Sequence, residues 1–340
     1  MRGKCANFPH VCSRAFRTGG AFFAYAGDCR FFRAAARIFG KIELQKSRGG
    51  TLNYRVKKNP KILFVVNIQK PDALDIAHKL AGMARRGGLD VEISTQYPTP
   101  EEYFRGIDTC CVIGGDGTIL SCAKMLAKYS VPVFGINLGK LGFLATYSGE
   151  IDEELFLLLA RGEGKIFERA MLSATYENKT HLVLNDFVLK DSRVNGISKF
   201  RIYADNEFIA EYVGDGLIFS TPTGSTAYNL SAGGPIIHPK SRTFVMTPIC
   251  PHTLSNRSLV LSYGTLVRLM CVSGESVLMA DGRQVATMAS GAELELYMPP
   301  CTVKFMRKRG HSHFGILRSK LGWADDPREI ETKLRASKQR

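Results

Sequence analysis

The chain has 340 residues, and its 46 lysines and arginines against 31 aspartates and glutamates give a formal net charge of +15. The excess lies at the two ends: residues 1–60 carry 13 basic against 2 acidic side chains, and residues 304–340 carry 11 against 4. The remaining body has 22 against 25, which argues against a nucleic-acid-binding core with a basic stripe inside the fold. No apolar run approaches the length needed to cross a membrane.

Residues 1–58 are rich in Arg, Phe and Ala, are poor in acids and show no clear element pattern, so we expect a disordered basic extension. Residues 31–39 could form a short basic amphipathic helix, as in mitochondrial transit peptides, or lie on a membrane surface. A third interpretation is a dispensable upstream extension. The odd count of nine cysteines without a C-x-x-C pair favours a reducing cytoplasm, with organelle targeting as the alternative.

Residues 59–147 alternate between apolar strand patterns and helix patterns. This alternation predicts an α/β nucleotide-binding domain with a parallel sheet wound on both faces, a doubly wound or Rossmann-like fold. Ligands bind at the carboxyl ends of such strands. The strands are expected at 61–67, 91–94, 110–113 and 131–136, and the helices at 71–86 and 119–127.

The sequence Gly114-Gly115-Asp116-Gly117 stands between the third of these strands and its helix. A glycine-rich turn lets backbone N–H groups approach an anion closely, and the helix N-terminus adds a favourable dipole. Asp116 would repel a phosphate there unless it binds a metal or accepts a proton from a substrate hydroxyl. The combination indicates phosphoryl transfer, although an isolated match could equally be a tight turn with an ordinary turn aspartate.

From about residue 165 the pattern changes to short alternating strands, which predict a β-rich, β-sandwich-like domain over 148–305. The last segment, 306–340, is expected to hold a helix at 312–321 that returns to the first domain, followed by a basic tail. Turns are expected at 205–206, 274–275 and 281–282. The strands are expected at 170–176, 181–190, 198–204, 207–212, 217–220, 259–261, 266–272, 277–280 and 293–298.

A second motif, residues 221–235, is dense in hydroxyls and glycines and follows an apolar strand. Small hydroxylated residues and bare backbone suit a surface that lies against ribose and phosphate oxygens, and Tyr228 could stack on a base or close the pocket. The competing interpretation is a Ser/Thr/Gly-rich linker, but linkers are rarely framed by apolar runs.

Several motifs in this order resemble those of NAD kinases, in particular the bacterial members, over about residues 61–323. They are Gly114–Gly117, Gly135–Leu144, Asn185-Asp186, Asp215-Gly216, Thr221–Pro235 and the closing Lys320–Trp323. The glycine-aspartate loop alone also occurs in lipid kinases and phosphofructokinases, so the order of the motifs carries the resemblance. Because the body resembles bacterial proteins, we favour a dispensable extension over organelle targeting.

The resemblance implies phosphorylation of the 2′-hydroxyl of the adenosine ribose of NAD, with ATP or another phosphoryl donor and a divalent cation such as Mg²⁺, to give NADP. Asp116 is the expected catalytic base, although it could be chiefly a metal or orientation ligand, and the metal ligands stay unassigned. A loose phosphoryl-transfer transition state needs alignment more than early deprotonation. The expected nucleotide- and NAD-binding residues are Gly114, Gly115, Asp116, Gly117, Asn185, Asp186, Asp215, Thr226, Ala227, Tyr228, Asn229, Leu230 and Ser231.

The stretch Asp281–Gln284 resembles a DGQ-type site of the family, but Arg283 intervenes, so neither Arg283 nor Gln284 is placed in the site. The expected partners are the small molecules NAD and ATP, with no nucleic acid and no membrane, and the resemblance suggests a homo-oligomer, a dimer or tetramer built through the β-rich domain. The alternatives are a lipid kinase of the diacylglycerol or sphingosine type and a non-catalytic dinucleotide sensor.

Overall fold

A computed structural model describes residues 59–139, 142–193, 196–253, 256–308, 310 and 312–323, all within one unit of the chain. The extension expected to be disordered over 1–58, with its candidate helix, and the basic tail beyond residue 323 lie outside the described residues. No helix of the described part is both long and apolar enough to span a membrane.

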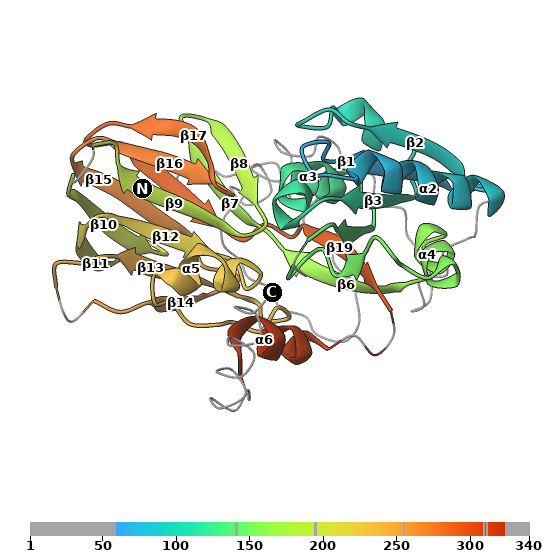
Figure 1. Ribbon diagram of the computed structural model, residues 1–340. Helices are drawn as coiled ribbons and strands as arrows, with labels where there is room; N and C mark the ends of the chain where they lie inside the picture. The colour runs from blue at the N-terminus through green and yellow to red at the C-terminus, as the bar shows by residue number, and fades with distance from the viewer. Residues whose placement is uncertain are drawn as a thin grey trace, which may run out of the picture. The chain divides into compact units, whose positions relative to one another are not determined.

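Six strands from the first part of the described chain and β19 from near its end build a seven-stranded sheet, here called sheet A (Figure 1). Its strand order is β2-β1-β3-β4-β19-β6, with β5 beside β4. All neighbours pair in parallel except β6, which runs antiparallel to β19. The strands are β1 (Lys61–Val66), β2 (Asp90–Ser94), β3 (Thr109–Ile113), β4 (Val133–Asn137), β5 (Tyr147–Ser148), β6 (Lys165–Ala170) and β19 (Thr302–Arg307).

Helices cover both faces of sheet A because successive side chains of its strands point to opposite sides. On one face, Phe64 and Phe134 pack against Phe156 of α4, with ring centroids 6.3 and 6.2 Å apart, and α2 adds its buried alanines. The other face carries α3, which contacts β3, β4 and β19. The doubly wound prediction is therefore confirmed. The helices are α2 (Ala73–Arg86), α3 (Asp116–Lys128) and α4 (Glu153–Ala160), with a short 3₁₀ turn η1 (Glu101–Phe104).

The β-rich part consists of two six-stranded antiparallel sheets, with orders β11-β10-β15-β18-β7-β8 (sheet B) and β14-β13-β12-β9-β16-β17 (sheet C). One apolar core holds buried residues of both, such as Phe200 and Leu269 from sheet B and Phe187, Phe219 and Phe244 from sheet C. The two sheets therefore face one another as the predicted sandwich. The strands are β7 (Leu172–Tyr176), β8 (Lys179–Val183), β9 (Asp186–Asp191), β10 (Ser198–Ala204), β11 (Glu207–Gly214), β12 (Gly216–Ser220), β13 (Thr243–Ile249), β14 (Leu259–Ser262), β15 (Val267–Ser273), β16 (Ser276–Ala280), β17 (Arg283–Met288) and β18 (Glu293–Tyr297).

The strand predicted at 181–190 is two strands. β8 ends at Val183 in sheet B, and β9 begins at Asp186 in sheet C, so the chain changes sheets at Leu184-Asn185. The backbone N–H groups of Leu184 and Asn185 at this corner donate hydrogen bonds to the Asp281 carboxylate. The interruption therefore arises from a distant partner and not from a local turn signal.

Two predicted turns are hairpins of the expected kind. Asp205-Asn206 joins β10 to β11 and Asp281-Gly282 joins β16 to β17, and all four residues have positive φ, as a type I′ turn requires. The turn at 274–275 joins β15 to β16, which belong to different sheets, so it is a crossing between sheets and not a hairpin.

The chain returns to sheet A through a strand that the sequence did not reveal. β19 inserts between β4 and β6, so sheet A extends beyond the boundaries placed at 147 and 305. Figure 1 shows β19 beside β6. The predicted C-terminal helix follows as α6 (His313–Leu321). Its His313 and Phe314 rings lie 5.6 and 5.8 Å from the His238 ring, in the connection between α5 (Tyr228–Ser231) and β13. β19 is hydrogen-bonded into sheet A, while the described ring contacts of α6 are with the β-rich part.

Candidate active site

The glycine-aspartate turn lies at the carboxyl end of β3, where the chain enters α3. A side chain at Gly114 would collide with Thr118 and Asn67, so the turn closes only with glycine there. A Cβ at Gly115 or Gly117 would meet open space. Bare backbone therefore faces outward at the N-terminus of a 13-residue helix, as an anion-binding turn requires.

The Asp116 carboxylate is held by three consecutive backbone N–H groups. Phe143 N donates to Oδ2 at 2.8 Å, and Leu144 N and Ala145 N donate to Oδ1 at 3.1 and 2.9 Å. A carboxylate has about four lone-pair positions, so one position remains for another partner. These three donor residues, Phe143, Leu144 and Ala145, are called the 143–145 segment below.

Two further glycines let the 143–145 segment approach Asp116. A Cβ at Gly142 would fall on the Asp116 carboxylate. A Cβ on Gly135, in the middle of β4, would come within 2.8 Å of both the Ala145 backbone and the Ile119 side chain of α3. Both glycines belong to the motif Gly135–Leu144, so that motif serves to bring backbone donors onto Asp116.

A second carboxylate is held in the same way in the β-rich part. Asp281 accepts hydrogen bonds from Leu184 N at 2.9 Å, Asn185 N at 2.8 Å and Asp186 N at 3.2 Å. Burial raises the pKa of Asp281 to about 6, while these three donors and nearby Arg283 act to lower it. Asp281 thereby fixes the corner that presents Asn185 and Asp186.

Asn185 and Asp186 have side chains that make no hydrogen bond within the described residues. Asp186 is only 5% exposed. Burial, followed by repulsion from Asp281, raises its pKa to about 7. A buried carboxyl group without partners beside a half-buried amide is suited to accept hydrogen bonds from the hydroxyl groups of a ligand.

The hydroxyl-rich loop is bonded to the same corner. Thr221 Oγ1 donates to Leu184 O at 2.6 Å and accepts from the backbone at Thr223 and Gly224. The loop packs so closely that a Cβ at Gly224 would overlap the Asn185 carbonyl. Several hydroxyls of the loop are thus used inside the protein, where the sequence suggested contact with ligand oxygens.

The predicted residues 226–231 have different surroundings. Asn229 is fully buried: its amide donates to Ser225 O and Pro235 O, each at 3.1 Å, and accepts from Thr247 Oγ1 at 2.7 Å. Its side chain therefore holds the loop together, with both amide N–H donors used inside the protein. Tyr228 and Ser231 are exposed, while Thr226, Ala227 and Leu230 are half-buried.

Asp215 lies away from Asn185 and Asp186. It precedes β12, whose Gly216 pairs with Lys190, whereas Ser220 at the other end pairs with Asp186. Four residues of strand separate these ends by roughly 13 Å. The Lys190 ammonium lies 4.6 Å from the centre of the Tyr228 ring. Asn185 and Asp186 therefore lie at one end of β12, Asp215 and Tyr228 lie toward the other, and the Asp116 turn lies in sheet A.

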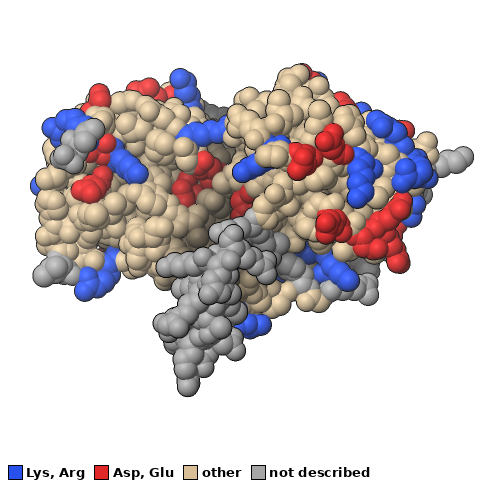
Figure 2. Space-filling model, viewed as in Figure 1, with Lys and Arg blue, Asp and Glu red and all other residues tan. Residues whose placement is uncertain are grey.

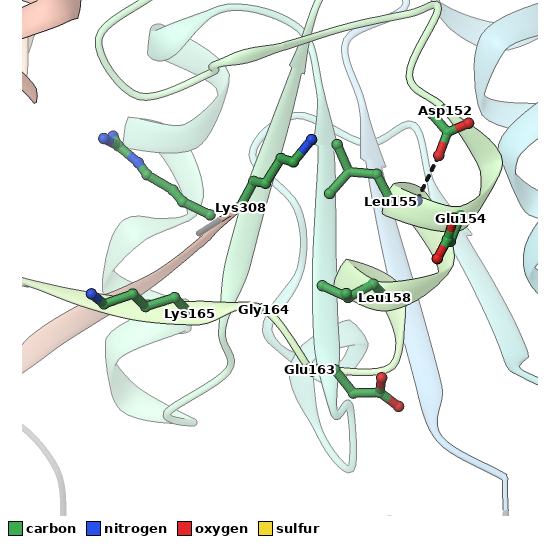
Figure 3. A pocket seen from close by; sticks show the side chains of 9 residues that line it. Asp152, Glu154, Leu155, Leu158, Glu163, Gly164, Lys165 and Lys308 are labelled. Carbon is green, nitrogen blue, oxygen red and sulfur yellow. Dashed lines mark hydrogen bonds between the residues drawn. The ribbon is translucent and has the colours of Figure 1, made fainter. Parts of the chain in front are cut away.

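A pocket of about 320 Å³ lies elsewhere, between α4 and the adjoining ends of β6 and β19 (Figure 3). None of the predicted site residues lines it. Asp152, Glu154 and Glu163 lie on its α4 side, and Lys165 and Lys308 lie on its strand side. Arg307 also lines it.

Sequence reasoning missed three contributors to these groups. Asp281 appeared only as a turn residue, and the 143–145 segment only as part of a motif. Arg307, which donates to the Phe143 carbonyl at 3.0 Å, gave no signal at all.

Comparisons with known proteins match both parts of the fold. The model of the ATP-NAD kinase N-terminal domain matches residues 90–156, and that of the C-terminal domain matches residues 184–308. The NAD kinase of Polaromonas naphthalenivorans is 37% identical over 262 residues, which cover 73% of this chain and 90% of that protein. The NAD kinase of Aquifex aeolicus is 39% identical over 219 residues, or 62% of this chain and 80% of that protein.

Two solved structures share the fold. Yeast NADH kinase complexed with NADH superposes with a TM-score of 0.71 at 22% identity, over 79% of this chain and 89% of that one. An NAD kinase from Archaeoglobus fulgidus in complex with ATP gives a TM-score of 0.63 at 23% identity, over 77% and 98%. With its relatives above 30% identity matched over most of their length, the chain belongs to the NAD kinase family.

Proposed function

We propose that this NAD kinase phosphorylates the 2′-hydroxyl of the adenosine ribose of NAD with ATP, and that Asp116 accepts the hydroxyl proton. The observation that carries the proposal is the Asp116 carboxylate, fixed by three N–H donors at a strand-to-helix turn with one acceptor position left. A hydroxyl oxygen at that position would be oriented for in-line attack. Orientation of this kind is the main demand of a loose phosphoryl-transfer transition state.

The donor phosphates would lie against the backbone N–H groups that open α3. Gly115 and Gly117 leave space there, and the helix dipole favours negative charge. These features support ATP as the donor and do not discriminate against a longer phosphate chain.

A divalent cation fits this arrangement only as a companion of the phosphates. In the described part of the chain, no group of three or more His, Cys, Asp or Glu side chains is placed to hold a metal ion. Mg²⁺ in phosphoryl-transfer sites commonly keeps several waters and takes one or two carboxylates plus substrate phosphates. If the remaining acceptor position of Asp116 held the ion in place of the hydroxyl, Asp116 would be the carboxylate ligand at this turn, and the ion would neutralise charge on the phosphates.

The acceptor nucleotide would be held at the Asn185-Asp186 corner. The unpartnered Asp186 carboxyl suits two ribose hydroxyls, and the Asn185 amide can both donate and accept. Asp215 and the exposed side chains of residues 226–231 would contact the rest of the dinucleotide from the other end of β12. Asn229 would contribute by holding the loop.

We further propose a homo-oligomer in the cytoplasm with no nucleic-acid or membrane partner. The outer strands β11 and β14 carry the exposed apolar side chains Phe208 and Val260, which a second copy could cover. On the face in Figure 2, basic side chains are interspersed with acidic ones and form no single stripe. Sedimentation velocity at several protein concentrations tests the oligomer.

A coupled assay for NADP formation from NAD, ATP and Mg²⁺ tests the reaction, with Asp116→Asn measured alongside. We expect NADP from the wild type and almost none from the variant. If the folded wild type forms no NADP, phosphorylation of diacylglycerol or sphingosine is assayed next. Calorimetry of NAD binding then separates a dinucleotide sensor from a lipid kinase.

A further inference from the structure

Arg307 is the last residue of β19, and its side chain is almost fully buried, with 2% exposure. Its Nη2 donates to the Phe143 carbonyl at 3.0 Å. The backbone N–H of Phe143 in turn donates to Asp116 Oδ2 at 2.8 Å. Phe143 therefore connects the buried guanidinium to the carboxylate. The two remaining donors to Asp116 belong to the next two residues.

The partners of Arg307 offer little compensation for burying its charge. Arg307 forms no salt bridge within the described residues, its Nε has no hydrogen-bond partner, and its guanidinium carbon lies 5.9 Å from the centre of the Phe167 ring, near the outer limit for a cation–π contact. Burial lowers the pKa of Arg307, while Tyr147 and the Asp116 charge act to raise it. Replacing buried charged groups with apolar side chains is often neutral or stabilising. A role in holding the 143–145 segment accounts for the arginine better.

We propose that Arg307 is a positioning residue for the phosphoryl transfer. Its guanidinium holds the Phe143 carbonyl and thereby fixes the three N–H groups that orient Asp116. The inference rests on the proposed role of Asp116. Without the guanidinium, the 143–145 segment keeps its covalent path but loses the anchor on its first residue. The carboxylate then samples orientations that do not face the substrate hydroxyl.

Arg169 provides a matched control. It lies on the neighbouring strand β6, where it pairs with Val303 of β19, and it is 6% exposed. Burial, followed by repulsion from Arg307, lowers the pKa of Arg169 to about 9. Its Nε has no hydrogen-bond partner, and none of the hydrogen bonds described for the 143–145 segment involves Arg169. Removing either guanidinium deletes a buried cation, but only removing Arg307 frees Phe143.

The test compares Arg307→Met, Arg307→Lys and Arg169→Met in the full chain, with kcat and both KM values measured and folding followed by thermal unfolding. We expect Arg307→Met to lower kcat about 100-fold with KM for NAD and ATP changed less than about threefold. Arg307→Lys, which can still donate to a carbonyl, should keep more of kcat. Arg169→Met should keep kcat within about threefold of the wild type.

Chemical rescue separates positioning from a general structural role. Because Arg307 lines the pocket of Figure 3, added guanidinium at millimolar concentration has a route into the space left by Arg307→Ala. We expect it to restore part of kcat in that variant, and to have no effect on Arg169→Ala, whose position does not line the pocket.

Near-normal kcat in a folded Arg307→Met variant, or equal losses in both methionine variants, would overturn the proposal. If Arg307→Met does not fold, Arg307→Lys and the rescue of Arg307→Ala decide it. Failure of the proposed function looks different: the wild type would make no NADP, or Asp116→Asn would turn over normally.

Discussion

Asp116 in sheet A and Asp281 in sheet C are held by the same arrangement, three consecutive backbone N–H groups on one carboxylate. The donors to Asp116 lie 27 to 29 residues after it, and the donors to Asp281 lie 95 to 97 residues before it. Asp116 stands at a glycine turn with open space around the backbone, whereas Asp281 stands at a hairpin beside the buried Asp186.

The difference lies in which group is held in place. At Asp116 the backbone segment holds the side chain, and this side chain is the one we propose to contact the substrate hydroxyl. At Asp281 the side chain holds the backbone segment, and the segment presents Asn185 and Asp186. One hydrogen-bond pattern thus orients the carboxylate that we propose as the base in one part of the fold, and in the other it fixes the corner that we propose to bind the acceptor. We therefore expect substitution of Asp116 to act mainly on kcat and substitution of Asp281 to act mainly on KM for NAD.

The largest effect is expected from Asp116→Asn. Its amide can accept from only part of the 143–145 segment, and it directs an NH₂ group at backbone donors. It also cannot take up a proton from a hydroxyl. We expect kcat to fall about 10³-fold or more, with KM for NAD almost unchanged. Steady-state kinetics and NAD calorimetry measure this, and near-normal turnover would exclude Asp116 as base or metal ligand.

Asp281→Ala should act on binding first. It leaves three N–H groups at the sheet-changing corner without their acceptor, which costs about 1–3 kcal/mol in stability. We expect KM for NAD to rise about tenfold, with a smaller change in KM for ATP and in kcat. An equal rise in both KM values would mean that the corner serves the donor as well. Gln284→Ala is the matched control on the same hairpin, because among the described residues its side chain forms a hydrogen bond only with Thr287.

The contrast between these sites also separates what the sequence could predict from what it could not. The glycine turn, the strand–helix alternation and both type I′ hairpins follow from local residue patterns. The corner at Leu184-Asn185 does not, since residues 181–190 have the apolar pattern of one strand and their interruption depends on Asp281, about a hundred residues later. Arg307 lies in an ordinary strand pattern, and its partner Phe143 is 164 residues away. Turns and strand patterns can be predicted from neighbouring residues, whereas contacts between residues far apart in the sequence cannot.

A moderate effect is expected from Asp186→Ala and Asp186→Asn. Loss of the carboxyl group in Asp186→Ala should raise KM for NAD more than KM for ATP, and the reverse pattern would mean that donor and acceptor positions are exchanged. Because the pKa of Asp186 is raised from 3.8 to about 7, the neutral acid stabilises the fold. That contribution is full below pH 4 and is lost as the pH rises through 7.

Asp186→Asn stays neutral at every pH and should therefore gain stability over the wild type as the pH rises. We expect the gain in the free energy of unfolding of the ligand-free enzyme to be about 1–3 kcal/mol larger at pH 8 than at pH 5. Thermal unfolding at both pH values measures it. A gain independent of pH would mean that Asp186 is ionised in the fold throughout this range.

The smallest effect is expected from deleting residues 1–58. Every donor to Asp116 and Asp281 lies between residues 143 and 186, and the first strand of sheet A begins at Lys61. Both carboxylates thus keep all their described backbone partners in the shortened chain. We expect kcat and both KM values within about twofold of the full chain, which is a change of about 0.4 kcal/mol. A folded truncation that has lost activity would show that the extension contributes to one of the two sites, and the parameter that changes would say which: kcat for Asp116, or KM for NAD at the corner fixed by Asp281.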